Sequence, residues 1–378
     1  MKYFIRRSAL CTAIILSIAG CGGPKFLMTE SQDVAPGVRY QRFTTEQPNR
    51  LYVLRVDLRD PRAQVAVFRT KGLVRTSRLV EEASRRGEAV TGAVNGDFFS
   101  FKTGWPVGNQ VSDGKVVAAL ASPRSHLAVD WNGRTFVGPV AFDGLVSRPT
   151  GGRWTVATVN QSLSADAVGA FTDAWYDSVG SLNGTTGMWM TLLDNQWSAS
   201  DTMHMVVDSI APAQGGQKVA ERQLLVAASN AGKQFSGVLQ GDTMSVYLGF
   251  SPRIAGLREL IGGGGRILID GAATDANDAK AESMGRDFIE RRHPRTFVAF
   301  YRDTTTLSVC AVDGRQAQSA GMSFHEMALF LRELGAWQAI NLDGGGSTTM
   351  VVQGRVVNSP SDKTGERPVA NILLIRQK

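Results

Sequence analysis

The residues of this sequence that are best suited to chemistry lie in one short segment, residues 339–350. An apolar strand-like run leads into Asp343, which is followed by the glycines Gly344, Gly345 and Gly346 and by three hydroxyl residues. Because glycines carry no side chain, their N–H groups can surround an anion, or a sugar can approach the main chain closely. The same residues could also form an ordinary glycine-rich turn between two strands.

A second acid has a similar setting, which indicates a weak internal repeat. In each unit a helix that begins at a serine and stops at a glycine precedes an apolar strand and an Asn-x-Asp loop: Ser77, Gly87, Asn95 and Asp97 in the first, Ser323, Gly335, Asn341 and Asp343 in the second. The serine and the asparagine are 18 residues apart in both units. The similarity could be coincidental, but a true repeat would place both loops at equivalent strand ends, where ligands tend to bind.

The elements that must position these loops predict an α+β fold. Strand-like runs recur from Leu51 to Ile375, and only two segments have a clear helical pattern, one of them opened by the capping box Ser323–Glu326. We therefore expect a single catalytic domain over residues 51–378, with mixed or antiparallel β-sheets and a few flanking helices. Residues 22–50 lack periodicity and are interpreted as a tether.

The first 21 residues have the pattern of a bacterial lipoprotein signal. Basic residues precede an apolar run, and the run ends in Ile18-Ala19-Gly20-Cys21, a lipobox. The pattern predicts export and a lipid anchor on Cys21, on the outer membrane or periplasmic face if the source is Gram-negative and otherwise on the cell surface. A plain secretory signal in which Cys21 is incidental is the alternative.

Composition limits the possible partners and cofactors. The formal charge of +7 falls to +4 when Lys2, Arg6 and Arg7 are removed with the signal, and no basic–aromatic stripe is present, so nucleic acid is not an expected partner. Four histidines do not suggest a metal site, and no cofactor is expected. Asp275, Asn277 and Asp278 lack the full spacing of a calcium loop and are better interpreted as a solvated loop.

With Cys11 and Cys21 in the signal, Cys310 has no disulfide partner and is predicted to be a buried apolar residue.

Several segments together resemble the phosphodiester glycosidase family. They are Asn95–Phe99, Ile261–Arg266, His293–Thr296, Val312–Arg315, Asn341–Ser347, Asn358–Asp362 and Gly365–Asn371. The resemblance covers about residues 89–375 and is nearly continuous from His293 to Asn371. One departure is Arg266, where the family usually has a proline after two glycines.

The resemblance implies hydrolysis of a sugar-1-phosphodiester in a polysaccharide or glycoconjugate, with release of the sugar. Such a reaction needs carboxylates at the anomeric carbon, for which Asp343 and Asp97 are the candidates. It also needs a phosphate site, which we assign to side-chain forks from Arg295 and Arg315, with Arg367 in reserve, and to the glycine loop. The further predicted substrate-binding residues are Asn95, Asn341, Gly344, Gly345, Gly346, Ser347 and Thr348.

Other interpretations of these residues remain open. Arg295 and Arg315 could form surface salt bridges, and Asp97 and Asp313 could simply form turns. Glu326 is explained by its capping box and is left out of the catalytic set. At the level of function, the same anion site could serve a phosphodiesterase that cuts P–O instead of C–O, or a non-catalytic lipoprotein that only binds an envelope glycan.

Overall fold

The computed structural model describes residues 25–122, 124–175, 182–214, 217–228 and 235–378. The signal segment and Cys21 lie outside these residues. Within the described residues, no helix is long and apolar enough to cross a membrane.

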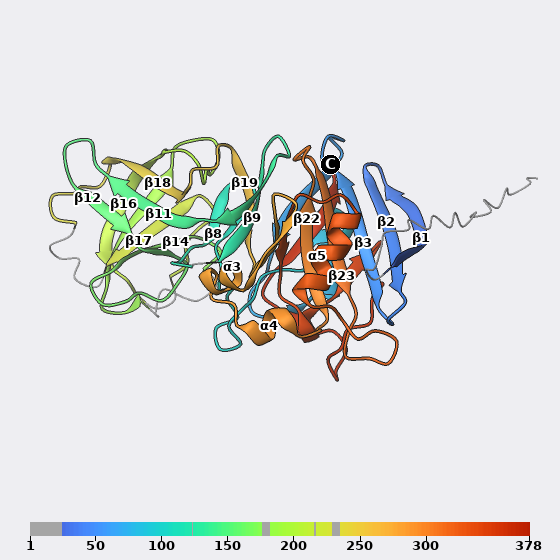
Figure 1. Ribbon diagram of the computed structural model, residues 1–378. Coiled ribbons are helices and arrows are strands. Elements are labelled where there is room, and N and C mark those ends of the chain that lie inside the picture. Colours follow the sequence, from blue (N-terminus) through green and yellow to red (C-terminus); the bar gives the residue numbers. More distant parts are fainter. Residues whose placement is uncertain (1–24, 123, 176–181, 215–216, 229–234) are drawn as a thin grey trace, which may run out of the picture.

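Two antiparallel sheets packed face to face form the centre of the molecule (Figure 1). In spatial order the first sheet contains β1 (Phe26–Ala35), β2 (Val38–Thr45), β3 (Arg50–Asp57), β23 (Thr306–Val312), β22 (Arg295–Phe300), β24 (Gln338–Asn341), β20 (Arg266–Ile269) and β21 (Ala272–Ala273). The second contains β26 (Arg355–Val356), β25 (Met350–Val352), β6 (Ala89–Asn95), β28 (Ile372–Gln377) and β4 (Ala63–Phe68). Valine and leucine side chains from both sheets, such as Leu54, Val94, Val309 and Leu373, fill the space between them.

A helix covers the outer face of each of these sheets. Helix α5 (Phe324–Glu333) places Phe324, Met327 and Leu331 on the first sheet, and α1 (Thr76–Arg85) packs Leu79, Val80 and Ala83 on the second. The layers are therefore helix, sheet, sheet, helix, with a short sheet of β5 (Val74–Arg75) and β27 (Pro368–Val369) beside α1. Two shorter helices, α3 (Ala276–Ala281) and α4 (Arg286–Glu290), precede β22.

The chain between β10 and β19 forms a second lobe, seen on the left of Figure 1. Its sheet contains β12 (Arg153–Val156), β11 (Ala141–Ser147), β18 (Thr243–Ser251), β16 (Met203–Pro212), β15 (Thr186–Leu192), β17 (Gln223–Ala228), β14 (Val168–Phe171) and β13 (Thr158–Val159). A connecting sheet contains β10 (Thr135–Pro139), β9 (Ser125–Asp130), β19 (Leu257–Gly262), β7 (Gln110–Ser112) and β8 (Lys115–Ala118).

The connecting sheet joins the two lobes through continuous apolar packing. On one side Leu127, Val129 and Ile261 belong to the core of the central sandwich. On the other, Val111 and Leu260 share a core with the lobe strands. The predicted α+β class with antiparallel and mixed sheets and few helices is confirmed.

The predicted tether over residues 22–50 is wrong for most of its length. Residues 26–35 and 38–45 form β1 and β2, and β2 pairs with β3 over Val38–Thr44. Val38 and Tyr40 are buried in the core between the two sheets and Phe43 in the core beneath α5, whereas Arg39 and Arg42 stay exposed. A hairpin at the edge of a sheet that keeps many polar residues looks like a linker in sequence, so the folded domain begins before residue 51.

The helix signals are confirmed at α5 and corrected at α1. The Ser323 hydroxyl accepts a hydrogen bond from the Glu326 N–H, and the Glu326 carboxylate accepts one from the Ser323 N–H, as the capping box predicts. Ser77 does not cap α1. Its N–H and hydroxyl both donate to the carboxylate of Glu366, which lies far along the chain.

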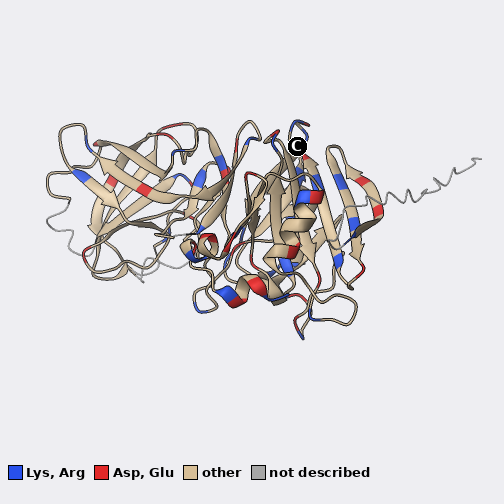
Figure 2. Cartoon of the chain, viewed as in Figure 1, with Lys and Arg blue, Asp and Glu red and all other residues tan. Residues whose placement is uncertain are grey.

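The structure tests two further predictions, one about Cys310 and one about the segment from Asp275 to Asp278. Cys310 is 1% exposed in the core beneath α5, as expected for a small apolar residue. Asp275 and Asp278 are not part of a loop: they form the capping box that opens α3. Figure 2 shows that basic and acidic residues are interspersed along the chain in both lobes.

Candidate active site

The two Asn-x-Asp loops meet where strands of the two central sheets end. β6 ends at Asn95 and β24 ends at Asn341, in different sheets of the sandwich. The Asp343 N–H donates to the Gly96 carbonyl oxygen at 3.0 Å, and the Asn95 side-chain amide donates to the Asp343 carbonyl oxygen at 2.6 Å. The fold therefore brings both candidate acids to one place, although they are 246 positions apart in the sequence.

Asp97 is held in a closely fitted pocket and is 1% exposed. Its carboxylate accepts a hydrogen bond from the Gly108 N–H at 2.8 Å, and its own N–H donates to the Asn371 side chain at 2.8 Å. A side chain at Gly262 would place its Cβ 2.4 Å from the Asp97 carboxylate, so only glycine fits there. The other carboxylate oxygen is buried without a hydrogen-bond partner among the described residues.

Burial raises the pKa of Asp97 to about 7. The Gly108 N–H and the guanidinium of Arg124 act in the opposite direction, and the nearby charge of Asp343 raises the value further. A carboxyl group with a pKa near 7 can both gain and lose a proton at neutral pH, which is the property required of a general acid or base.

Asp343 is the second acid, and its surroundings are more polar. Burial raises its pKa to about 6, opposed by the Ser347 hydroxyl, the Gly344 N–H and the guanidinium groups of Arg367 and Arg124. The Gly344 N–H donates to the carboxylate at 2.9 Å. At neutral pH, Asp343 is therefore the more ionised of the two acids.

Arg124 is a residue of this site that the sequence did not reveal. Its positive charge lowers the pKa of both Asp97 and Asp343, and its guanidinium carbon lies 4.9 Å from the centre of the Phe98 ring. It precedes β9 in a segment without any recognisable motif. Only the tertiary structure brings it to the acids.

The glycine loop is covered by two further arginines. A Cβ at Gly345 would lie 3.2 Å from a terminal nitrogen of Arg315, and one at Gly346 would lie within 2.5 Å of a terminal nitrogen of Arg367. Gly345 also has a φ of +62°, which favours glycine. The glycines are needed here because guanidinium groups approach the main chain closely.

The backbone donors of this loop are only partly available. The Gly344 N–H donates to Asp343, and the Gly345 N–H donates to the Pro294 carbonyl oxygen at 2.8 Å. Among the described residues, Gly346 alone of the three has an N–H that no protein acceptor takes. The prediction that all three N–H groups face an anion is therefore wrong for Gly344 and Gly345.

Arg295 does not provide the predicted phosphate fork. Its side chain is 0% exposed, and Nε and Nη2 donate to the carbonyl oxygens of Met322, Phe288 and Arg291 at 3.0, 2.5 and 3.0 Å. The rings of Phe288 and Phe324 pack against the guanidinium, and burial lowers its pKa to about 9. It is neither the predicted fork nor a surface salt-bridge partner; it is an internal cross-link beneath the loop.

Arg315 keeps a position suited to an anion. One of its terminal nitrogens lies 3.3 Å from Nδ1 of His293. Burial and the charges of Arg295, Arg315 and Arg291 lower the pKa of His293, so its neutral ring can accept this hydrogen bond. Arg367 is held by Asp362, with Nε 2.7 Å from the carboxylate.

The other predicted binding residues are buried around the two loops. Asn95 is 0% exposed, and its side-chain oxygen accepts hydrogen bonds from the Thr296 hydroxyl and the Thr349 N–H. The Asn341, Ser347 and Thr348 side chains are also buried, the Asn341 amide donating to the Leu342 carbonyl oxygen. The prediction that Asn95 contacts substrate is corrected: its hydrogen bonds join the two acid loops.

Two of the remaining signals are structural. Asp313 is not a surface turn residue: it is buried, and it accepts hydrogen bonds from Tyr52, Asn358 and the Ser359 N–H. Arg266, the departure from the family pattern, pairs with the buried carboxylate of Glu282 at 2.9 Å, which compensates its charge.

A histidine that the sequence did not single out also adjoins Asp97. His126 is fully buried, and its Nε2 accepts a hydrogen bond from the Asn109 N–H at 2.9 Å, next to Gly108. Burial lowers its pKa to about 4, so the ring is neutral and helps to shape the Asp97 pocket.

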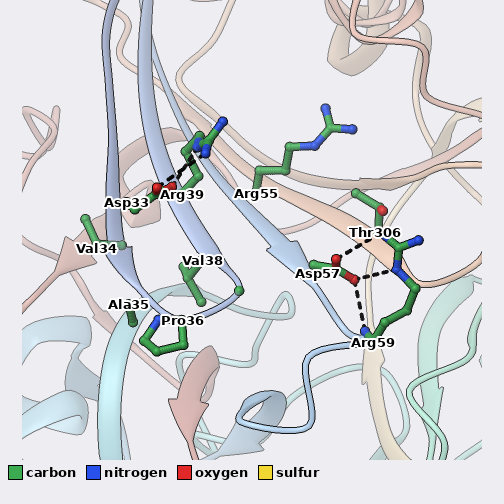
Figure 3. Close-up of a pocket in the computed structure, with 11 residues that line it drawn as sticks. Asp33, Val34, Ala35, Pro36, Val38, Arg39, Arg55, Asp57, Arg59 and Thr306 are labelled. Atoms are coloured by element: carbon green, nitrogen blue, oxygen red, sulfur yellow. Dashed lines mark hydrogen bonds and ion pairs between the residues drawn. The ribbon is translucent and has the colours of Figure 1, made fainter.

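A hollow of about 640 Å³ lies elsewhere, at the turn between β1 and β2 (Figure 3). It is lined by exposed ion pairs, Arg39 with Asp33 and Arg59 with Asp57. The hollow lies at the Asp57 end of β3. The opposite end of β3 is nearer to the candidate site, because the Arg50 carbonyl oxygen there accepts a hydrogen bond from the N–H of the buried Asp313. The hollow contains no buried acid, so the cluster of acids and glycines, in which Asp97 and Asp343 have raised pKa values, is the better candidate for chemistry.

The fold thus brings two buried acids beside a glycine loop that two arginines cover. The family model "Phosphodiester glycosidase" matches residues 199–376. The N-acetylglucosamine-1-phosphodiester alpha-N-acetylglucosaminidase of Mus musculus is 33% identical over 113 residues, which are 30% of this chain and 22% of that protein. The predicted resemblance to the phosphodiester glycosidase family is thus confirmed over residues 199–376.

Two solved structures share the fold over nearly the whole chain. A hypothetical protein from Synechocystis has a TM-score of 0.67 at 18% identity, covering 97% of this chain and 64% of that one. A protein of Burkholderia pseudomallei K96243, named as a candidate exported protein, has a TM-score of 0.62 at 22% identity, covering 89% of this chain and 74% of its own. The chain spans only about a fifth of the length of the mouse enzyme.

The burial of Asp97 makes a prediction about stability. Because its pKa is about 7 in the folded protein and 3.8 in the unfolded chain, the neutral carboxyl stabilises the fold at low pH, and this stability is lost as the pH rises through 7. At high pH, a pKa shift of this size lowers the free energy of unfolding by on the order of 4 kcal/mol. We therefore expect Asp97→Asn to melt at a higher temperature than the wild type at pH 8, with a much smaller difference at pH 4.5.

The matched control for that measurement is Asp60→Asn. The Asp60 carboxylate is paired with Arg62, which lowers its pKa to about 2, so its removal should give no gain at pH 8. If Asp97→Asn melts below the wild type by the same amount at pH 8 and at pH 4.5, the ionised carboxylate of Asp97 does not destabilise the folded protein, and the prediction is wrong.

The different positions of Arg295 and Arg315 give a second prediction. Lysine cannot reach the three carbonyl oxygens that hold Arg295, so Arg295→Lys should lower the unfolding free energy by roughly 1.5–3 kcal/mol. Arg315→Lys should leave the melting temperature unchanged and lower kcat/KM for a sugar-1-phosphodiester by about 10- to 100-fold, since a fork on the phosphate is lost. Arg39→Lys, in an exposed pair, should change neither. These assignments are contradicted if Arg315→Lys lowers the melting temperature while Arg295→Lys lowers kcat/KM without changing the melting temperature.

Proposed function

We propose that this protein hydrolyses a sugar-1-phosphodiester at the bond between the anomeric carbon and its oxygen, releasing the sugar and leaving a phosphomonoester. The observation that supports this most directly is the meeting of Asp97 and Asp343, two buried acids with raised pKa values, beside a glycine loop under two guanidinium groups. Paired carboxyl groups serve glycoside hydrolysis, and arginines serve phosphate recognition.

The two acids would have different roles. Asp343, with a pKa of about 6, is mainly ionised at neutral pH, and its charge would stabilise the positive anomeric carbon, attack it or activate a water molecule. Asp97, with a pKa of about 7, keeps a proton more often and would exchange it with the departing oxygen or with water. Since a phosphate group leaves readily as an anion, a strong general acid is not required.

The phosphate would lie between Asp343 and the arginines over the loop. Arg315 and Arg367 offer N–H groups above Gly345 and Gly346, and the Gly346 N–H adds a backbone donor. Arg124 would neutralise charge between the acids and the phosphate. We thus replace Arg295, the fork predicted from sequence, by Arg367 and Arg124.

The substrate class rests on the same site and on the names of the relatives. The mouse enzyme is named for an N-acetylglucosamine-1-phosphodiester, and we propose a diester of this chemical class for this chain, within a polysaccharide or glycoconjugate. No cofactor or metal is needed for the steps described.

We also propose export and a lipid anchor on Cys21, which would place the enzyme at the outer membrane or cell surface. The lipobox motivates this, and the Burkholderia protein that shares the fold is named as a candidate exported protein. The single cysteine in the described residues, Cys310, is buried and free, which is compatible with an oxidising compartment.

Hydrolysis in oxygen-18 water tests the reaction. With an N-acetylglucosamine-1-phosphodiester of methanol as substrate, we expect the label in the released sugar, because water attacks the carbon. Asp343→Asn should lower kcat by at least about 10²-fold without loss of stability, since it removes the charge from the reacting centre. Asp33→Asn, at an exposed carboxylate, serves as the control. Label in the phosphate would mean that P–O is cut, and absence of turnover would favour a glycan-binding protein.

Fractionation of cells tests the anchor. Cys21→Ala should move the protein from the membrane fraction to the soluble fraction with an unchanged melting temperature, because no disulfide is lost. A variant that is processed and still sediments with membranes would show that another element holds it there.

A further inference from the structure

The described chain enters the fold at the end of the first sheet that carries the candidate site. Phe26 begins β1 and pairs with Thr45 of β2. Across the sheet, the same end is formed by Arg50, which begins β3, by Arg295, which begins β22, and by Asn341, which ends β24. The glycine loop follows Asn341 directly. The start of β1 and the candidate site therefore lie at one end of the sandwich.

The opposite end of the sandwich is marked by two other features. The turn at Pro36 joins β1 to β2 there. The C-terminus, marked in Figure 1, lies at this end too, because β28 pairs Ile372 with Asn95 and then runs away from Asn95 to Gln377. The strand β3 has 8 residues, and a strand of this length spans about 27 Å. The two ends are thus well separated.

The proposed lipid anchor on Cys21 would be attached close to the first of these ends. Only residues 22–25 stand between Cys21 and β1, and even a fully extended chain of this length reaches at most about 18 Å. With the Pro36 turn on the membrane, the start of β1 would be about 27 Å away from it, which is beyond this reach. Either the end that carries the candidate site or the edge strand β1 must therefore face the membrane.

The charges along β1 do not favour contact between this edge and a membrane. Asp33 pairs with Arg39 at 2.7 Å, and Glu30 pairs with Arg42 at 3.2 Å. The carboxylates and guanidinium groups of this hairpin therefore balance each other. A neutral edge has no net attraction for the anionic headgroups of a bacterial membrane.

The end with the candidate site, in contrast, has exposed positive charges. Arg50, Arg315 and Lys363 are exposed, and among the described residues none of them forms an ion pair with a carboxylate. The loops that carry Arg315 and Lys363 are joined to each other, because the Gln316 side-chain amide donates to the Ser359 carbonyl oxygen at 2.7 Å. We call the surface formed by Arg50, Arg315 and Lys363 the basic end.

We propose that the basic end is a membrane-facing surface, held against the anionic headgroups of the membrane that contains the Cys21 lipid. The inference rests on the proposed anchor and is independent of the reaction. Basic groups near such a membrane are attracted to it over about a Debye length, roughly 8–10 Å, and the short connection to Cys21 keeps the basic end near this range. The candidate site then opens toward the layer next to the membrane.

Quenching by lipids with a nitroxide on the headgroup tests this orientation. Since Cys310 is buried and Cys21 would be acylated, one introduced cysteine can carry a fluorophore on the full-length protein. The exposed positions are Gln318→Cys beside Arg315, Pro36→Cys at the opposite end and Gln32→Cys on β1. In vesicles of phosphatidylethanolamine and phosphatidylglycerol, we expect quenching at Gln318→Cys to be at least about 3-fold stronger than at the other two positions, since the length of a strand separates the ends.

Charge reversal tests whether headgroups hold the basic end. Adding Arg50→Glu and Lys363→Glu should lower the quenching at Gln318→Cys by about 2-fold or more, and removing phosphatidylglycerol or raising the salt concentration should act in the same direction. The matched control is Arg134→Glu with Arg153→Glu, two exposed positions outside the basic end, which changes the net charge equally and should leave the quenching unchanged. Equal melting temperatures of the two double variants show that both are folded.

The outcomes separate the membrane-facing surface from the proposed function. Strongest quenching at Gln32→Cys, equal quenching at all three positions, or no response to charge reversal overturns the inference. Protein that is not acylated and does not sediment with vesicles overturns it together with the anchor. Turnover of a sugar-1-phosphodiester is measured on the same preparations. If turnover is absent while the quenching pattern is as expected, the proposed reaction fails and the membrane-facing surface stands.

Discussion

The structure around the site depends on the burial of two carboxyl groups near each other at the point where the two central sheets end. Burial penalises the charge of each group and so raises the pKa values of Asp97 and Asp343 to about 7 and 6, and the charge of Asp343 adds a smaller increase to the pKa of Asp97. The protein tolerates this through donors that are fixed by the fold: the Gly108 N–H, the Gly344 N–H and Arg124. The cost of burying both acids falls on the free energy of folding.

The same constraint explains the buried asparagines around the acids. Asn95 joins the Asp343 main chain to Thr296 of β22 and to Thr349, and Asn371 joins the Asp97 N–H to Gln110 of β7. Each amide offers a donor and an acceptor, so one side chain can connect three strands or loops. Because these contacts cross between sheets, the two acid loops are fixed relative to each other and not merely each to its own strand.

The sequence predicted the fold class and the acids more successfully than the phosphate site. Strand-like runs marked most strands of the two central sheets but fewer of the second lobe, and the repeated helix–strand–loop unit placed Asp97 and Asp343 at strand ends that the structure brings together. β1 and β2 were missed because an edge hairpin has a polar face. Arg124 could not be found, because no local pattern marks it, and Arg295 was misassigned because its motif does not show that α4 and the turn before α5 supply the three carbonyl oxygens that hold it.

Arg295 shows how a motif residue can matter to an anion site without touching the anion. Its Cδ lies 3.8 Å from where a Cβ on Gly344 would be, so the aliphatic part of the side chain packs next to the glycine loop, and the whole side chain is buried. The structure pairs it with carbonyl oxygens and aromatic rings and with no carboxylate among the described residues, so its positive charge is not cancelled. If the proposed phosphate binds above the loop, such a charge in a site of low effective dielectric would attract it. In that proposal the arginines would have two roles, a fixed internal charge from Arg295 and hydrogen-bond donors from the arginines above the loop.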